Sequence, residues 1–168
     1  MSLEEVERFL MLCAIGHSNL FERNRYMSDS TGLTGSLFEE KAIGTCRAQW
    51  TGVYLRFNDA VAEVRKNQPP LRTSTAAKLS MMVTEQLGKP VRFYTAVKSC
   101  ADIMHGIDGF FEIEGGAIIV TVDLTLNSNK DACKADLLIG LDDVRNLPAL
   151  AARVVGRFQT KLRRASAV

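Results

Sequence analysis

Residues 106–126 read GIDGFFEIEGGAIIVTVDLTL, and this stretch decides the fold. Residues 107–113 and 117–126 are rich in β-branched and aromatic side chains, which favour strands. The Glu-Gly-Gly of residues 114–116 lies between them and is typical of a turn. The sequence therefore predicts a β-hairpin about this turn, and residues 117–126 form the strongest strand pattern of the chain.

Side chains alternate between the two faces of a strand, so Thr121, Asp123 and Thr125 are predicted to share one face. The other face is apolar and is predicted to be core; it carries Val120, Val122, Leu124 and Leu126. A carboxylate on so apolar a strand loses its hydration and needs a cation or hydrogen-bond donors. Asp123 is therefore the first candidate functional residue.

Asp108 and Asp123 are placed symmetrically about the turn. Asp108 is seven residues before Gly115, and Asp123 is seven residues after Gly116. Pairing of the two strands brings both carboxylates to the same end of the hairpin, where they repel each other. A divalent metal relieves that repulsion. The sequence therefore predicts a Mg²⁺ (or Mn²⁺) ion held by Asp108, Asp123 and the backbone carbonyl of Leu124.

This pattern resembles the core motif of the PD-(D/E)XK nuclease superfamily, in which an Asp opens one strand and a second carboxylate lies on the next. Asp108 and Asp123 match these positions, and the resemblance covers about residues 76–164. It implies a restriction-endonuclease-like fold and metal-dependent hydrolysis of phosphodiester bonds. The family has a lysine two residues after the second carboxylate, where this chain has Thr125. The work of that lysine would then pass to Lys130 or Lys98.

Further residues are assigned to this site. Glu85, on the helix before the hairpin, is an additional acidic candidate beside Asp108, Asp123 and Lys130 for catalysis. Asp102 and Thr125 are expected next to the metal ligands without binding the ion. The predicted metal site fits phosphodiester cleavage, because bound Mg²⁺ lowers the pKa of water and stabilises the charge that develops on the phosphate.

Each of these residues also has an ordinary structural interpretation. Asp108 followed by Gly109 is a common turn pair. Asp123 and Thr125 can cap the loop that follows them. The remaining candidates are of types usually found on surfaces or in caps: Glu85, Lys98, Asp102, His105 and Lys130.

The other elements predicted in this half are a helix over residues 76–87 closed by Gly88, a strand or extended segment over 91–97, a strand over 135–140, and a helix over 146–164. Asn146 is the expected cap of the last helix, with Pro148 in its first turn. The fold class is therefore α/β, a restriction-endonuclease-like mixed sheet flanked by helices.

The first half is predicted to be a helical N-terminal layer. Helices are expected over residues 4–15 and 36–65, the second beginning with the capping box Ser36-Leu-Phe-Glu39. Its buried stripe is expected to consist of Cys46, Trp50, Val53, Tyr54, Phe57, Val61 and Val64. Two prolines break the pattern within residues 67–75. We therefore predict a helical layer over 1–70 and a nuclease-like core over 71–168, packed as one compact unit.

Composition excludes several classes of protein. The 168 residues are 46% hydrophobic, too apolar for a disordered chain, and no stretch approaches the roughly 18 apolar residues of a membrane helix. The four cysteines have no zinc-site spacing and are expected to be reduced thiols. The start, MSLEEVE, lacks the basic residues of a secretory signal, so a cytoplasmic protein that does not bind membranes is expected.

The net charge of +2 gives no argument for nucleic acid, but the basic residues are unevenly distributed. The last helix carries Arg153, Arg157, Lys161 and Arg164 on one face, a stripe that could follow the phosphates of DNA. The alternative is that these residues complement the helix macrodipole.

Three functional hypotheses follow. The favoured one is a Mg²⁺-dependent nuclease that acts on DNA more than on RNA. The second is a non-catalytic protein with the same core, which binds nucleic acid or a protein. The third is an interaction module whose N-terminal helices mediate assembly. A homo-oligomer is compatible with all three.

Overall fold

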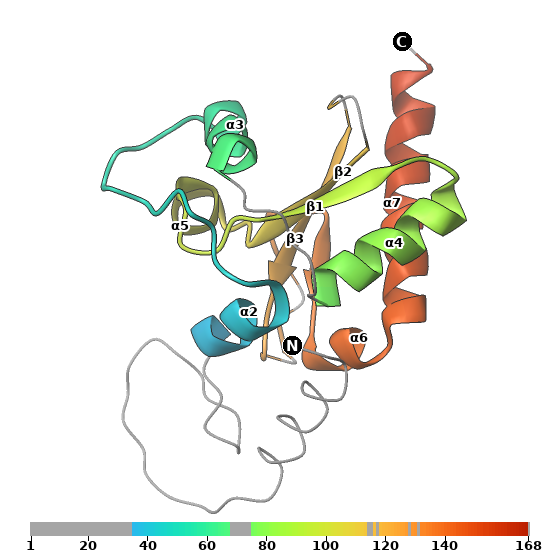
Figure 1. The fold of residues 1–168 in the computed structure, drawn as a ribbon, viewed down its shortest axis with the longest axis horizontal. Helices are drawn as coiled ribbons and strands as arrows, with labels where there is room; N and C mark the ends of the chain where they lie inside the picture. Colours follow the sequence, from blue (N-terminus) through green and yellow to red (C-terminus); the bar gives the residue numbers. More distant parts are fainter. Residues whose placement is uncertain are drawn as a thin grey trace, which may run out of the picture.

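The computed structural model describes residues 35–67, 75–113, 116, 118–127, 129–130 and 132–167. Its centre is a sheet of four strands in the order β1-β2-β3-β4. The antiparallel strands β1 (Val91–Thr95), β2 (Gly109–Ile113) and β3 (Ile119–Leu124) form a meander, and β4 (Leu137–Ile139) pairs parallel to β3. The sheet is mixed and lies between helices (Figure 1), which agrees with the predicted α/β class.

Helices cover one face of the sheet and build the larger core there. They are α2 (Gly35–Ile43), α4 (Thr75–Leu87) and α7 (Leu147–Ala165). As predicted from the alternation of β3, Val120, Val122 and Leu124 are buried on this face. The long helices α4 and α7 pack against each other as well as against the strands (Figure 1).

The opposite face carries a smaller core, built around Phe110 of β2. It is covered by α3 (Phe57–Asn67), which contributes Val61 and Val64, and by α5 (Cys100–His105). A further short helix, α6 (Leu141–Arg145), leads directly into α7.

The predicted elements of residues 76–165 are present in the structure. Gly88, with φ +67°, follows α4 at its predicted end. The side chain of Asn146 accepts a hydrogen bond from the Ala149 amide at 3.3 Å, and Pro148 lies in the first turn of α7. The predicted break over 67–75 falls between the end of α3 and the start of α4.

The prediction of one helix over residues 36–65 is wrong. Helix α2 ends at Ile43, and Gly44 follows it with φ +76°. This left-handed conformation, which glycine adopts without steric cost, ends a helix. Residues 44–56 therefore form an irregular segment with neither helix nor strand, in which Gly52 also has positive φ, before α3 begins at Phe57.

The predicted buried stripe fails in the same segment. Trp50, Val53 and Tyr54 are exposed, because no helix turns them toward a common face. Val61 and Val64, which do lie on a helix, are buried as expected.

Some expectations fall on residues outside the described ranges, namely the helix over 4–15 and the thiol of Cys13. Cys46, Cys100 and Cys133 carry free thiols. Within the part of the chain that the structure describes, no helix is both long enough and apolar enough to cross a membrane.

Candidate metal centre

The register of the hairpin brings Asp108 and Asp123 to the same end of β2 and β3. Gly109 pairs with Val122, so Asp108 and Asp123 are the residues next to this pair on their two chain segments. The amide of Asp108 donates a hydrogen bond to the carbonyl of Val122 at 2.9 Å. The two acids thus lie at the same end of the hairpin, as their symmetric placement about the turn predicts. Asp123 alternates with Val122 and Leu124 of β3, so it points away from the larger core.

Close packing explains the glycine that follows Asp108. A Cβ atom on Gly109 would lie 2.5 Å from Cζ of Phe93 and 2.9 Å from the carbonyl oxygen of Tyr94. Gly109 belongs to β2, so the interpretation of Asp108-Gly109 as a turn pair is wrong. The close approach of β1 positions the start of β2, and the Asp108 carboxylate accepts a hydrogen bond from the Leu124 amide at 2.5 Å.

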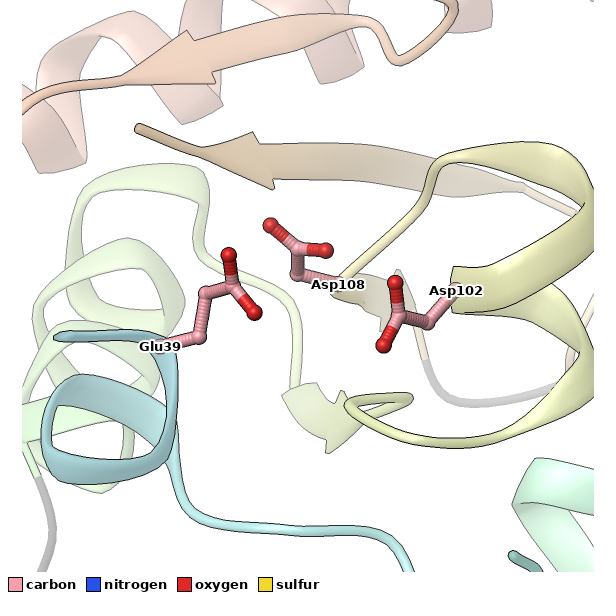
Figure 2. Close-up of side chains that lie close together, drawn as sticks. All are labelled: Glu39, Asp102 and Asp108. Carbon is pink, nitrogen blue, oxygen red and sulfur yellow. The ribbon is translucent and has the colours of Figure 1, made fainter. Parts of the chain in front are cut away.

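Two further carboxylates meet Asp108. Figure 2 shows Glu39 from α2 and Asp102 from α5 pointing toward it. Each of the three offers an oxygen within 4.8 Å of the others. Divalent cations bind oxygens at about 2.0–2.6 Å, so two oxygens on one ion are at most roughly 5 Å apart. These three residues, the carboxylate cluster, could therefore hold one metal ion.

The short helix α5 holds Asp102 in place. Its N-cap Ser99 accepts a hydrogen bond from the Ala101 amide at 3.1 Å, and Gly106, with φ +68°, ends the helix. The carboxylate of Asp102 accepts a hydrogen bond from the Lys98 amide at 2.7 Å. Asp102 thus supports the turn before α5, one of its predicted interpretations, and also reaches the cluster.

Asp123 is buried beside the cluster, and its carboxylate contacts Lys130. The Lys130 ammonium lies 2.7 Å from Oδ2 of Asp123. The structure thus groups Asp108 with Glu39 and Asp102, whereas the sequence pairs it with Asp123 as a metal ligand. Of the two lysines considered for the missing family position, Lys130 reaches Asp123, and Lys98 forms an ion pair with Glu40 at 2.5 Å.

Local side-chain hydrogen bonds turn the loop that returns Lys130 to Asp123. Thr125 Oγ1 accepts a hydrogen bond from the Asn127 amide at 3.1 Å, and Asn127 Oδ1 accepts one from the Asn129 amide at 3.0 Å. Such Ser/Thr and Asx turns reverse the chain over short distances. The interpretation of Thr125 as a loop cap is confirmed, and the turns let a lysine seven residues after Asp123 contact it.

The carboxylates of the cluster hold their protons more strongly than usual. Burial, followed by the charges of Asp102 and Asp123, raises the pKa of Glu39 to about 7. Burial and then the charge of Glu39 raise the pKa of Asp108 to about 8. The pKa of Asp102 is also raised, mainly by burial. Uncompensated negative charge of this kind favours a bound cation.

Glu85 lies away from the cluster. It is exposed near the end of α4, which leads into the start of β1. The cluster lies near the other end of β1, where Thr95 pairs with Gly109, the residue next to Asp108. The remaining predicted metal ligand, Leu124, is buried and donates its amide to Asp108.

The basic stripe on α7 is partly engaged in the protein's own contacts. Arg153 forms an ion pair with Asp143 and donates to the Leu138 carbonyl at 2.9 Å. Lys161 bonds Asp136 at 2.6 Å and the carbonyl of Ile119 at 2.9 Å. Lys161 therefore contacts the start of β3, at Ile119, whereas Asp123 lies near the end of that strand. Two of the four predicted phosphate contacts therefore have structural roles, while Arg157 and Arg164 are exposed.

The residue that sequence reasoning missed is Glu39. The sequence assigns it to a capping box with Ser36, but Ser36 Oγ contacts Glu40 at 3.4 Å and Glu39 faces the hairpin. Helix α2 also carries the buried residues Phe38, Ala42 and Ile43, which attach it to the core. An acid between buried apolar neighbours is the one signal that could have identified it.

No family model matches the chain, and neither do the curated proteins or the solved structures with which it was compared. Three carboxylates from separate elements, with a lysine nearby, could hold a metal ion.

Proposed function

We propose that this protein is a divalent-metal-dependent nuclease that hydrolyses phosphodiester bonds in DNA. The observation that carries the proposal is the convergence of Glu39, Asp102 and Asp108 at the end of the hairpin, with oxygens within 4.8 Å of one another. Paired carboxylates on a hairpin are also what the resemblance to PD-(D/E)XK nucleases implies, although that resemblance concerned Asp108 and Asp123.

The chemistry assigns a role to each residue. Mg²⁺ or Mn²⁺, when bound, lowers the pKa of a water molecule and stabilises charge on the phosphate. Glu39, Asp102 and Asp108 would hold the ion, and the Leu124 carbonyl is a further oxygen ligand in the proposal. Lys130, fixed by Asp123, would offer its ammonium to the phosphate as a positive charge.

The second candidate function is a nucleic-acid-binding protein on the same core. Two observations favour it. Thr125 occupies the family's lysine position, and Lys130 already forms an ion pair with Asp123 at 2.7 Å. Such a protein would bind DNA in a salt-dependent manner without cleaving it.

The test is cleavage of end-labelled single-stranded, duplex and branched DNA with Mg²⁺, with Mn²⁺ and with EDTA. We expect cleavage only with metal, and Asp108→Asn should reduce the rate about 100-fold or more. Metal ions supply several kcal/mol of stabilisation, and each 1.36 kcal/mol is a factor of about ten. The matched control is Asp142→Asn, because the Asp142 side chain on α6 is 97% exposed.

Calorimetry with Mn²⁺ separates the two functions. A nuclease should bind Mn²⁺, and Asp108→Asn should weaken that binding. DNA binding without metal binding or cleavage would contradict the nuclease proposal and support the second candidate.

A further inference from the structure

Exposed apolar side chains are concentrated on one part of the surface. Of the six large hydrophobic residues that are exposed in the described part of the chain, five lie on residues 44–56 or on α5: Trp50, Val53, Tyr54, Ile103 and Met104. Trp50 is 40% exposed and Tyr54 59%. Scattered exposed apolar residues need no explanation, but a concentration of them marks an interaction surface. We call residues 44–56 the aromatic loop.

Hydrogen bonds hold this loop in place. The Trp50 amide donates to the carbonyl of Lys98 at 2.8 Å, and its indole N–H donates to the carbonyl of Val53 at 2.9 Å. Farther along, the ring nitrogen Nε2 of His105 bonds the carbonyl of Leu55 at 2.9 Å, and the His105 ring contacts Tyr54. The aromatic rings are thus positioned in advance, which lowers the entropic cost of binding.

The loop is attached to the elements that build the carboxylate cluster. It follows α2, which carries Glu39, and it runs alongside α5, which carries Asp102 (Figure 1). Lys98 links the two directly: its carbonyl binds the Trp50 amide, and its own amide binds the Asp102 carboxylate. Lys98 is also the one described non-glycine residue with positive φ, at +68°. Strained backbone of this kind is often found at functional sites.

The charge of the loop fits an anionic partner. Residues 44–56 include Arg47 and Arg56, both exposed, and no acidic residue. Basic side chains interspersed with aromatic rings bind single-stranded nucleic acid, since arginines contact phosphates and rings stack on bases. In a duplex the base faces are covered by their neighbours and cannot stack on protein rings.

We infer that the aromatic loop and α5 bind the unpaired bases of a single-stranded nucleic acid beside the carboxylate cluster, with Trp50 and Tyr54 as stacking platforms. This inference rests on the proposed function, because it names the substrate class of that site. A second copy of this chain and residues 1–34 of the same chain are the competing occupants, and the test separates them.

Trp50 is the single tryptophan of the chain, so its fluorescence reports on this surface alone. The full-length protein is titrated with oligo(dT) in EDTA, where no metal-dependent cleavage occurs. Saturable quenching is expected with the single strand, and a duplex of equal length should quench much less. Quenching that is equal for single strand and duplex, or absent, overturns the inference.

Variants measure the stacking directly through the anisotropy of a labelled oligonucleotide. Trp50→Ala and Tyr54→Ala should each weaken single-strand binding roughly 5- to 150-fold, the range expected for loss of one stacked base. Met81→Ala is the matched control, because Met81 is exposed on α4 away from the loop. Circular dichroism of each variant checks that the fold is retained.

The competing occupants give different results. If a second copy covers the loop, sedimentation shows a dimer that Trp50→Ala converts to a monomer without changing DNA affinity. If residues 1–34 cover it, Trp50 emission is blue-shifted and protected from acrylamide before any DNA is added. Either result overturns the inference.

The two proposals can fail separately. Single-strand binding that depends on Trp50 without any metal-dependent cleavage supports the surface and contradicts the nuclease. Cleavage of DNA with binding unaffected by Trp50→Ala and Tyr54→Ala supports the nuclease and overturns the role of the loop.

Discussion

At the scale of single residues, the proposed chemistry depends most on the contact between Lys130 and Asp123. Asp123 is buried, and a buried carboxylate needs a cation or hydrogen-bond donors nearby. Lys130 supplies that cation, and its charge also acts to lower the pKa of Glu39 within the cluster. The pair therefore links the predicted site on the strand to the carboxylates that converge from other elements.

Lys130→Ala should lower the cleavage rate about 100-fold, a typical cost of removing one group that stabilises developing charge. Mn²⁺ affinity should remain or increase, because the variant leaves the site more negative. Lys130→Arg should restore part of the rate. The measurement is kcat beside the calorimetric Kd for Mn²⁺.

Lys89→Ala, in the exposed turn after α4, is the control for a general loss of positive charge. A lower Mn²⁺ affinity with unchanged kcat in Lys130→Ala would contradict the proposed contact with phosphate.

At the scale of elements, the hairpin of β2 and β3 depends on a close approach to β1. Gly109 has no side chain and so lets Phe93 and the carbonyl of Tyr94 lie against the start of β2. Asp108 is the residue immediately before it. The packing of two strands thus positions a carboxylate of the cluster.

Gly109→Ala should destabilise the protein by about 1–3 kcal/mol, the usual cost of an overpacked core. It should also weaken Mn²⁺ binding, because the start of β2 must shift and carries Asp108 with it. Urea unfolding and calorimetry measure the two effects.

Gly156→Ala is the matched control, since no atom beyond its chain neighbours and the adjacent backbone of α7 lies within 4 Å of the added Cβ. It should stabilise the protein by about 0.5–1 kcal/mol, because alanine favours a helix more than glycine does. Equal stability of Gly109→Ala and the wild type would contradict the packing argument.

At the scale of the whole molecule, folding itself brings the carboxylates together. Glu39, Asp102 and Asp108 come from α2, α5 and the start of β2, and the unfolded chain keeps them apart. Folding without a cation therefore favours protonated carboxyl groups, and stability becomes linked to pH.

Without metal, the melting temperature should fall between about pH 5 and pH 8.5. The pKa of Glu39 is raised to about 7 and that of Asp108 to about 8. The folded state therefore holds protons that the unfolded state has lost. The resulting stability is fully present below the ordinary pKa values near 4 and is lost as pH rises through 7–8.

Mn²⁺ should reverse this trend, because it replaces the protons of the cluster. The increase in Tm caused by Mn²⁺ should grow with pH and reach roughly 5–10 °C at about 100 times Kd. Differential scanning fluorimetry in EDTA and in Mn²⁺ measures both trends. Asp108→Asn should reduce both slopes, and a wild-type Tm that is flat with pH in both buffers would contradict the linkage.

Much of the fold could be predicted because local patterns encode it. Residues 117–126 alternate, Gly88 ends a helix, and Asn146 caps one, and each of these features depends on neighbours in the chain. The prediction of one helix over 36–65 was wrong because apolar periodicity does not indicate that Gly44 adopts a left-handed conformation. The same error assigned Trp50 and Tyr54 to the core, although they are exposed.

By itself, the sequence determined the hairpin and the placement of Asp108 and Asp123 at one end of it, because strand pairing about a short turn is a local property. Only the tertiary structure decided that Glu39 and Asp102 join Asp108, that Glu85 does not, and that the aromatic loop lies alongside α5. These positions depend on how helices far apart in the sequence pack onto the two faces of the sheet. The physical reason is that this packing is set by the burial of apolar surface. The positions of the polar residues along the sequence therefore do not indicate which of them the packing brings together.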